Sequence, residues 1–107
     1  MMALKKLRNN KNTKGICRLV ITEEMTIYVI ESLKEEISKV LDGHDKFELN
    51  LGEVEEIDSA GIQLILALRT ELVRKKKELT ISDMSASVTR IIESYGINHY
   101  FKTADAI

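Results

Sequence analysis

Residues 47–61, FELNLGEVEEIDSAG, decide the fold of this chain because they lead from a buried strand into a helix. The alternating apolar residues of 47–51 have the period of two that is typical of a strand. The stretch ends in Asp58-Ser59-Ala60-Gly61, and a long, mostly apolar helical pattern covers 62–76. This order predicts that Ser59 lies at the turn between the strand and the helix.

Ser59 has two interpretations at such a turn. The first N–H groups of a helix lack partners within the helix and carry partial positive charge. A phosphate on Ser59 would therefore be received by free donors and a favourable dipole. The same hydroxyl can instead serve as a plain N-cap. The residues themselves leave both interpretations open.

The remaining segments predict alternating strands and helices. Strands are expected at 16–21 and 79–81, and residues 3–8 are the expected hairpin partner of the first, through a turn at 9–15. An amphipathic helix is expected from Ile30 to Leu41, closing near Asp42-Gly43. A third helix carries 88–95, with Ser85 or Ser87 as its cap and Gly96 as its end.

This alternation is typical of an α/β fold, with a mixed β-sheet whose parallel central strands are flanked by α-helices. The Ser59 turn would then lie at the carboxyl end of a central strand, where open α/β sheets place their functional sites. From Ile62 to Leu68 only Gln63 is polar. We expect a helix this apolar to be covered on more than one side, or to offer its first turn to a partner with Gln63 pointing outward.

Length and composition exclude several classes of protein. A chain of 107 residues with 44% hydrophobic residues predicts one domain with a real core. A net charge of −1 and 5% aromatic residues argue against a nucleic-acid partner. The single cysteine, Cys17, is expected to be an inert core residue in a reducing compartment. Because neither a membrane-spanning stretch nor a signal-peptide core is found, we expect a cytoplasmic protein without membrane insertion.

Catalysis and metal binding have little support. The two histidines, His44 and His99, are far apart in sequence and have no zinc-site spacing. No nucleophile-elbow, Walker-type or Gly-x-Gly-x-x-Gly motif is present. We therefore expect no enzyme, no cofactor and no metal. The N-terminal segment 1–15, which carries several basic residues and no acidic one, is interpreted as a solvated hairpin or loose end. The basic cluster 74–77 is interpreted as a set of cations that interact favourably with the C-terminal end of a helix dipole.

The Asp-Ser-Ala-Gly-Ile sequence, following a strand and an acidic loop, resembles the STAS domain of bacterial anti-sigma-factor antagonists. The resemblance continues upstream through Met25-Thr26-Ile27-Tyr28 and downstream through 79–82, 87–92 and 95–97, so that it covers about residues 15–101. It implies a single STAS domain over residues 1–107, with 1–15 as a loose or hairpin segment.

What the resemblance implies about function is specific. Ser59 would be phosphorylated by an anti-sigma factor that is also a serine kinase. The unphosphorylated protein would bind this kinase and free a sigma factor, phosphorylation would release the kinase, and a PP2C-type phosphatase would reset Ser59. The protein would act as a monomer. The implied partner-binding residues are Asp58, Ala60, Gly61, Ile62, Gln63, Thr26 and Tyr28. Among them, Asp58 would shape the turn and Gly61 would let another chain approach.

Some alternatives remain open at this point. Tyr28 can instead pack at a helix start. The chain can be a STAS adaptor in a chemotaxis or other signalling complex, or a STAS subunit of a lipid-transport ATPase complex. It also departs from the family pattern twice: Glu23 stands where many relatives have a glycine at a reverse turn, and Lys76-Lys77 where many have a glycine pair.

Overall fold

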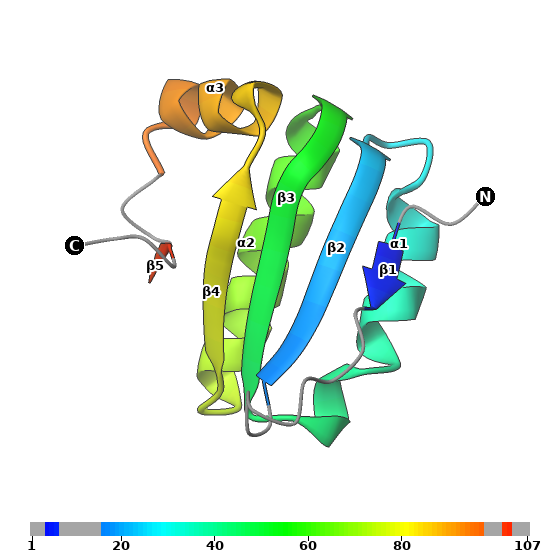
Figure 1. Cartoon of the computed structure of the whole chain (residues 1–107), viewed down its shortest axis with the longest axis vertical. Coiled ribbons are helices and arrows are strands. Elements are labelled where there is room, and N and C mark those ends of the chain that lie inside the picture. The colour runs from blue at the N-terminus through cyan, green and yellow to red at the C-terminus, as the bar shows by residue number, and fades with distance from the viewer. Residues whose placement is uncertain (1–3, 7–15, 98–101, 104–107) are drawn as a thin grey trace.

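The computed structural model describes residues 4–6, 16–97 and 102–103. Strands and helices alternate along the chain (Figure 1). In chain order the elements are β1 (Leu4–Lys6), β2 (Ile16–Met25), α1 (Ile30–Ser38), the 3₁₀ helix η2 (Leu41–Gly43), β3 (Lys46–Ile57), α2 (Ser59–Arg74), β4 (Glu78–Met84), α3 (Ala86–Tyr95) and β5 (Lys102–Thr103).

The five strands form one sheet in the order β1-β2-β3-β4-β5. Strand β1 is antiparallel to β2, while β2, β3, β4 and β5 are mutually parallel. The predicted mixed sheet with parallel central strands is therefore confirmed. Leu4 pairs with Ile21, which confirms the expected pairing of the first two strands for residues 4–6. The expected turn at 9–15 lies outside the described residues.

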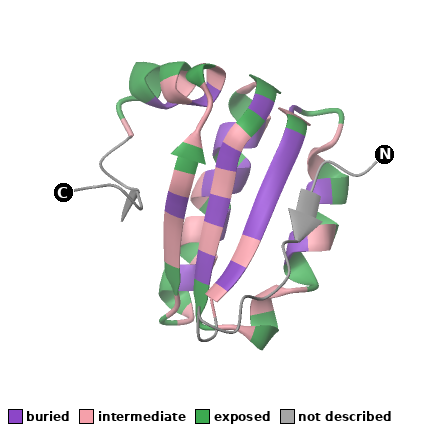
Figure 2. Ribbon diagram, in the orientation of Figure 1, coloured by how far each residue is buried: buried purple, intermediate pink, exposed green. Residues whose placement is uncertain are grey.

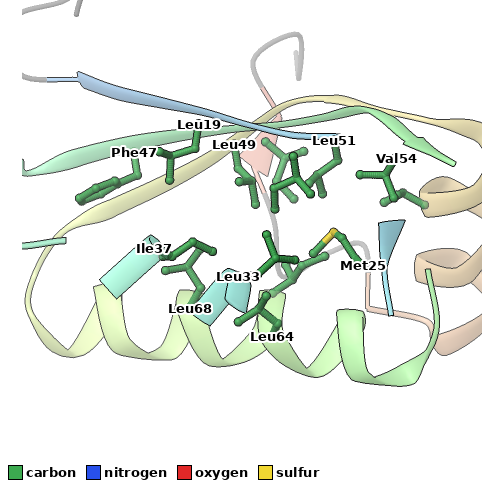
Figure 3. Packing of buried hydrophobic residues seen from close by; sticks show 14 of the residues in the cluster. Leu19, Met25, Leu33, Ile37, Phe47, Leu49, Leu51, Val54, Leu64 and Leu68 are labelled. Carbon is green, nitrogen blue, oxygen red and sulfur yellow. The ribbon is translucent and has the colours of Figure 1, made fainter. Parts of the chain in front are cut away.

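The core lies between the sheet and two helices. Figure 3 shows Leu33 and Ile37 of α1 and Leu64 and Leu68 of α2 on one side, and the inward side chains of β2 and β3 on the other. Purple segments in Figure 2 mark this buried interior. Each fully buried leucine or isoleucine contributes about 1.5–3 kcal/mol by leaving water. The largest side chains with under 2% exposure are Phe47, Leu19, Ile21, Met25, Leu33, Leu49, Leu51, Ile62, Ile65, Leu72, Ile81 and Ile92.

Strand β3 is longer than its sequence predicts. The expected strand covers 47–51, whereas β3 runs to Ile57. The added residues pair with the end of β2, from Thr22↔Glu53 to Met25↔Ile57. Glutamates are poor strand formers, so local propensity favours a loop here. Backbone pairing with β2 and burial of Val54, which is 1% exposed, override that propensity.

Among the residues that the structure describes, two that are not glycine have a left-handed backbone. Glu23 has φ 70° and Lys76 has φ 61°. Lys76 follows the C-cap of α2, and its N–H donates to the carbonyl of Val73 while the next N–H donates to Leu72. This is the Schellman arrangement, which glycine usually occupies. The two departures from the family pattern therefore fall where the backbone favours glycine.

Candidate functional site

Asp58 organises the turn that leads into α2. It is the N-cap of the helix, and its Oδ1 accepts hydrogen bonds from the N–H groups of Ala60 (2.9 Å) and Gly61 (3.2 Å). Its Oδ2 accepts a third, from the N–H of Ile27 at 3.0 Å. One carboxylate thus caps α2 and ties it to the connection between β2 and α1. The expectation that Asp58 shapes the turn is confirmed.

Ser59 is the first residue of α2 and is exposed. Because Asp58 fills the N-cap position, the interpretation of Ser59 as a plain N-cap is wrong. The expectation of free donors for a phosphate also needs correction, since two N–H groups of the first turn are already bonded to Asp58. A phosphate on Ser59 would meet the negative charge of the adjacent carboxylate.

Gly61 is buried and is approached by its own chain. A Cβ on Gly61 would lie 2.3 Å from the carbonyl oxygen of Met25 and 2.8 Å from Cγ1 of Ile57. The glycine therefore lets the start of α2 pack directly on the ends of β2 and β3. The expectation that Gly61 admits another chain is corrected, because the approaching backbone belongs to β2.

The next two residues of α2 face opposite ways. Ile62 is 1% exposed and belongs to the core, so its expected contact with a partner is corrected. Gln63 is exposed, which confirms that it points outward. Ala60 is half-buried at the edge of this surface. Of the α2 residues implied as partner-binding, Ala60 and Gln63 therefore present side chains to solvent.

The β2–α1 connection carries the largest exposed apolar side chains near Ser59. Tyr28 is 90% exposed, so the alternative that it packs at a helix start is wrong. Ile27 is 64% exposed. The sequence does not predict this exposure, because Ile27 lies in the irregular connection between β2 and α1, which has no periodic pattern. Thr26 is 8% exposed, and its hydroxyl donates to a carboxylate oxygen of Glu24. Thr26 therefore supports the connection more than it presents a surface.

Two grooves flank the Ser59 turn. The first, which we call the acidic groove, has a volume of about 850 Å³ and lies between the ends of β2 and β3 and α3. Asp58 and Tyr28 are among its walls. The second, the apolar groove, has a volume of about 270 Å³ and lies between α1 and α2, with Ile27, Ala60 and Gln63 among its walls. The turn with Ser59 thus separates a charged concavity from an apolar one.

Neither groove has the character of a metal site. Within residues 4–6, 16–97 and 102–103, no three His, Cys, Asp or Glu side chains are grouped so that they would hold a metal ion. In the same part of the chain, no helix is long and apolar enough to span a membrane. The chemistry of the turn is that of a hydroxyl, a capping carboxylate and exposed apolar side chains, which suits recognition of a protein surface.

The fold and the serine-bearing turn define a STAS domain. A family model described as "Mlab, STAS domain" matches residues 10–103, and the chain belongs to this STAS family. No curated protein matched the sequence.

Solved structures of anti-sigma-factor antagonists have the same fold. The unphosphorylated antagonist SpoIIAA aligns with a TM-score of 0.75 at 16% identity, over 95% of this chain and 88% of that one. The phosphorylated form of the Bacillus cell fate determinant SpoIIAA gives 0.71 at 15% identity, over 95% and 91%. An antagonist from Mycobacterium paratuberculosis gives 0.80 at 18% identity, over 97% and 87%. Likeness at such low identity concerns the fold.

Proposed function

We propose that this protein is an anti-sigma-factor antagonist that works as a phosphoswitch at Ser59. With Ser59 unmodified it binds an anti-sigma factor that is also a serine kinase, and phosphorylation releases that kinase. A PP2C-type phosphatase restores the binding form. The observation that carries the proposal is the position of Ser59: it is exposed at the start of α2, and its hydroxyl is not needed as the cap.

Charge explains how one modification releases a partner. Phosphorylation adds about −1.5 to −2 charges at pH 7. Asp58 already occupies two of the backbone N–H groups nearest the new phosphate and adds its own negative charge. A partner covering Ser59 would therefore bury a poorly matched anion, with a penalty of several kcal/mol. A loss of about 3 kcal/mol weakens binding more than a hundredfold.

The surface around Ser59 supports a binding role without catalysis. Ile27 and Tyr28 expose apolar area next to the serine, and the apolar groove continues it along α1 and α2. Aromatic residues are favoured at the centres of protein interfaces. In this proposal the chain acts as a cytoplasmic monomer, and the kinase and the phosphatase supply the chemistry.

A second candidate is a STAS adaptor that docks in a signalling or transport complex without phosphorylation. The observation that favours it is the exposure of Ile27 and Tyr28, because their contacts do not depend on the hydroxyl of Ser59. The two candidates differ in one respect: only the phosphoswitch requires affinity to change when charge is placed at Ser59.

Charge substitution at Ser59 tests the proposal. The partner is recovered by pull-down from native lysate, identified by mass spectrometry, and its affinity is measured by calorimetry. We expect Ser59→Ala to bind like the wild type and Ser59→Asp to bind at least tenfold more weakly. Ser38→Asp is the matched control, because Ser38 is an exposed serine at the far end of α1. Equal affinities for all variants would favour the adaptor.

Phosphate mapping completes the test. The recovered partner is incubated with the protein and ATP, and the modified residue is located by mass spectrometry. We expect modification at Ser59. Modification concentrated at Ser85 or Ser87 would contradict the proposal; in the structure Ser85 caps α3 and the hydroxyl of Ser87 donates to the carbonyl of Glu55.

A further inference from the structure

The acidic groove beside Ser59 carries an excess of negative charge. Four carboxylates line it, contributed by Glu24, Glu55, Glu56 and Asp58, against the single cation of Arg90 among the described lining residues. Figure 2 shows exposed residues at the ends of β2 and β3 and along α3. These are the elements that contribute the lining residues of the groove. A concave site lined by one sign of charge concentrates its field and attracts ligands of the opposite sign.

Among the described residues, no cation forms an ion pair with these carboxylates. The ion pairs in this part of the chain join other residues, such as Arg74 with Glu71 and Arg18 with Glu48. Glu55 and Glu56 are exposed, and no described cation lies within ion-pair distance of either. An incoming cation would therefore gain attraction to Glu55 and Glu56 without displacing a described cation.

The groove also has an apolar component. Ile57 and Ile91 lie in its walls and pack against the core, and the exposed ring of Tyr28 stands at its edge. A free metal ion would use none of this apolar area. A groove with both apolar and acidic groups instead matches a polypeptide that carries both basic and apolar side chains.

We propose that the acidic groove binds a basic segment of the partner protein. In this arrangement Arg or Lys side chains face Glu24, Glu55 and Glu56, and an apolar side chain packs against Tyr28 and Ile91. The inference rests on the proposed function, because it assumes that a protein docks at the Ser59 end of the sheet. The groove proposal adds to the proposed function the kind of side chains that the partner would place on the α3 side of Ser59.

A pair of synthetic peptides tests the groove directly. One is a short amphipathic peptide with arginines and leucines, and the other has glutamates in place of the arginines. Each is titrated into isotope-labelled protein and followed by NMR, which detects weak binding. We expect the arginine peptide to shift the amide signals of Glu56, Ser87 and Arg90, and the glutamate peptide to shift none of them.

Variants of the groove give the quantitative part of the test. The double substitution Glu55→Gln and Glu56→Gln should weaken the arginine peptide by about 3- to 10-fold, since exposed charge pairs contribute little individually. Arg90→Gln should strengthen it. Glu35→Gln, an exposed carboxylate of α1, is the matched control and should change nothing.

Several outcomes would overturn the groove proposal: equal binding of both peptides, no shifts at all, or shifts centred on α1 or on the apolar groove. Failure of the phosphoswitch is distinguishable, because the peptide titration involves neither the kinase nor a modified serine. Groove binding that persists while Ser59→Asp leaves kinase affinity unchanged would refute the switch alone.

Discussion

Replacing Gly61 with alanine tests how tightly the site is built into the fold. The added Cβ would lie 2.3 Å from the carbonyl oxygen of Met25, 2.8 Å from Cγ1 of Ile57 and 2.9 Å from Cβ of Met25. The nearest obstacle is the backbone at the carboxyl end of β2, so it has no rotamer by which to move away. The start of α2 must instead shift away from β2.

The expected magnitude is the difference between opposing effects. Alanine in place of glycine within a helix contributes about 1 kcal/mol of stability. Overpacking a dense interior costs about 1–3 kcal/mol, and occasionally more. A shift of α2 also weakens the bonds from Asp58 N–H to the Met25 carbonyl (3.3 Å) and from Ile27 N–H to Asp58 (3.0 Å). At about 0.5–1.5 kcal/mol for each bond, we expect a net loss of about 2–3 kcal/mol.

Thermal unfolding followed by circular dichroism measures this loss. A change of 1 kcal/mol shifts the Tm of a domain of this size by about 4–8 °C, so Gly61→Ala should melt about 10–20 °C below the wild type. Gly43→Ala is the matched control, because a Cβ there meets nothing within 4 Å. If Gly61→Ala melts within about 2 °C of the wild type, well under the shift expected for 1 kcal/mol, close packing at this glycine does not constrain the turn.

Five further substitutions have definite expected outcomes. Lys76→Gly should raise the Tm by about 4–8 °C, because a left-handed backbone at a residue other than glycine costs roughly 1 kcal/mol. Gly96→Ala should lower the Tm by a similar amount, because Gly96 has φ 66° and a Cβ there would meet only open space. Asp58→Ala should lose about 1–2 kcal/mol of the free energy of unfolding. Asp58→Asn should keep most of the capping stability but lose the acceptor for the N–H of Ile27. Its free energy of unfolding, measured by denaturant titration, should therefore lie between those of the wild type and Asp58→Ala. Gln63→Arg should change the free energy of unfolding by less than about 0.5 kcal/mol yet weaken partner binding by calorimetry; early melting would mean that Gln63 is not a surface residue.

The sequence predicts the architecture well because its signals are local. Apolar residues at helical spacing on 30–41 and 88–95 produce α1 and α3, and the alternation of strands and helices leads to the parallel order. The length of β3 was not predictable in this way. Its last residues are held by pairing with residues of β2 that lie 31 or 32 positions earlier in the sequence, as in Thr22↔Glu53 and Met25↔Ile57, so no local pattern of residues 53–57 records it.

The candidate site was predicted in position but not in the division of roles. Asp58 and Ser59 are both good capping residues, and only the extended backbone of Asp58, with φ −124° and ψ −170°, decides which one caps α2. The burial of Ile62 was available from the sequence, because Ile62, Ile65 and Leu72 follow one face of a helix. The exposure of Ile27 was not, since the irregular connection between β2 and α1 has no period.

At the two positions where this chain departs from the family pattern, the side chain differs from glycine but the backbone conformation is the one that glycine favours. Glu23 and Lys76 replace expected glycines, yet both keep the left-handed backbone that glycine favours. The surrounding structure enforces the conformation: Glu23 lies at a register shift between β2 and β3, and Lys76 closes the end of α2. The loop shape is therefore retained at a cost in stability, and neither residue lies in the turn that holds Ser59.

The two proposals place opposite electrostatic effects side by side, and their magnitudes decide which one dominates. A basic segment in the acidic groove would attract a phosphate on Ser59, but an exposed pair contributes at most about 1 kcal/mol and is screened beyond about 8 Å at physiological salt. Burying the phosphate beside Asp58 costs several kcal/mol and is screened much less. If both proposals hold, phosphorylation would therefore release the partner despite the basic segment. Added salt should weaken the wild-type complex. The ratio of the affinities of the wild type and Ser59→Asp should stay at least as large as at low salt. A ratio that falls towards one as salt rises would show that long-range charge, and not burial of the charge, operates the switch.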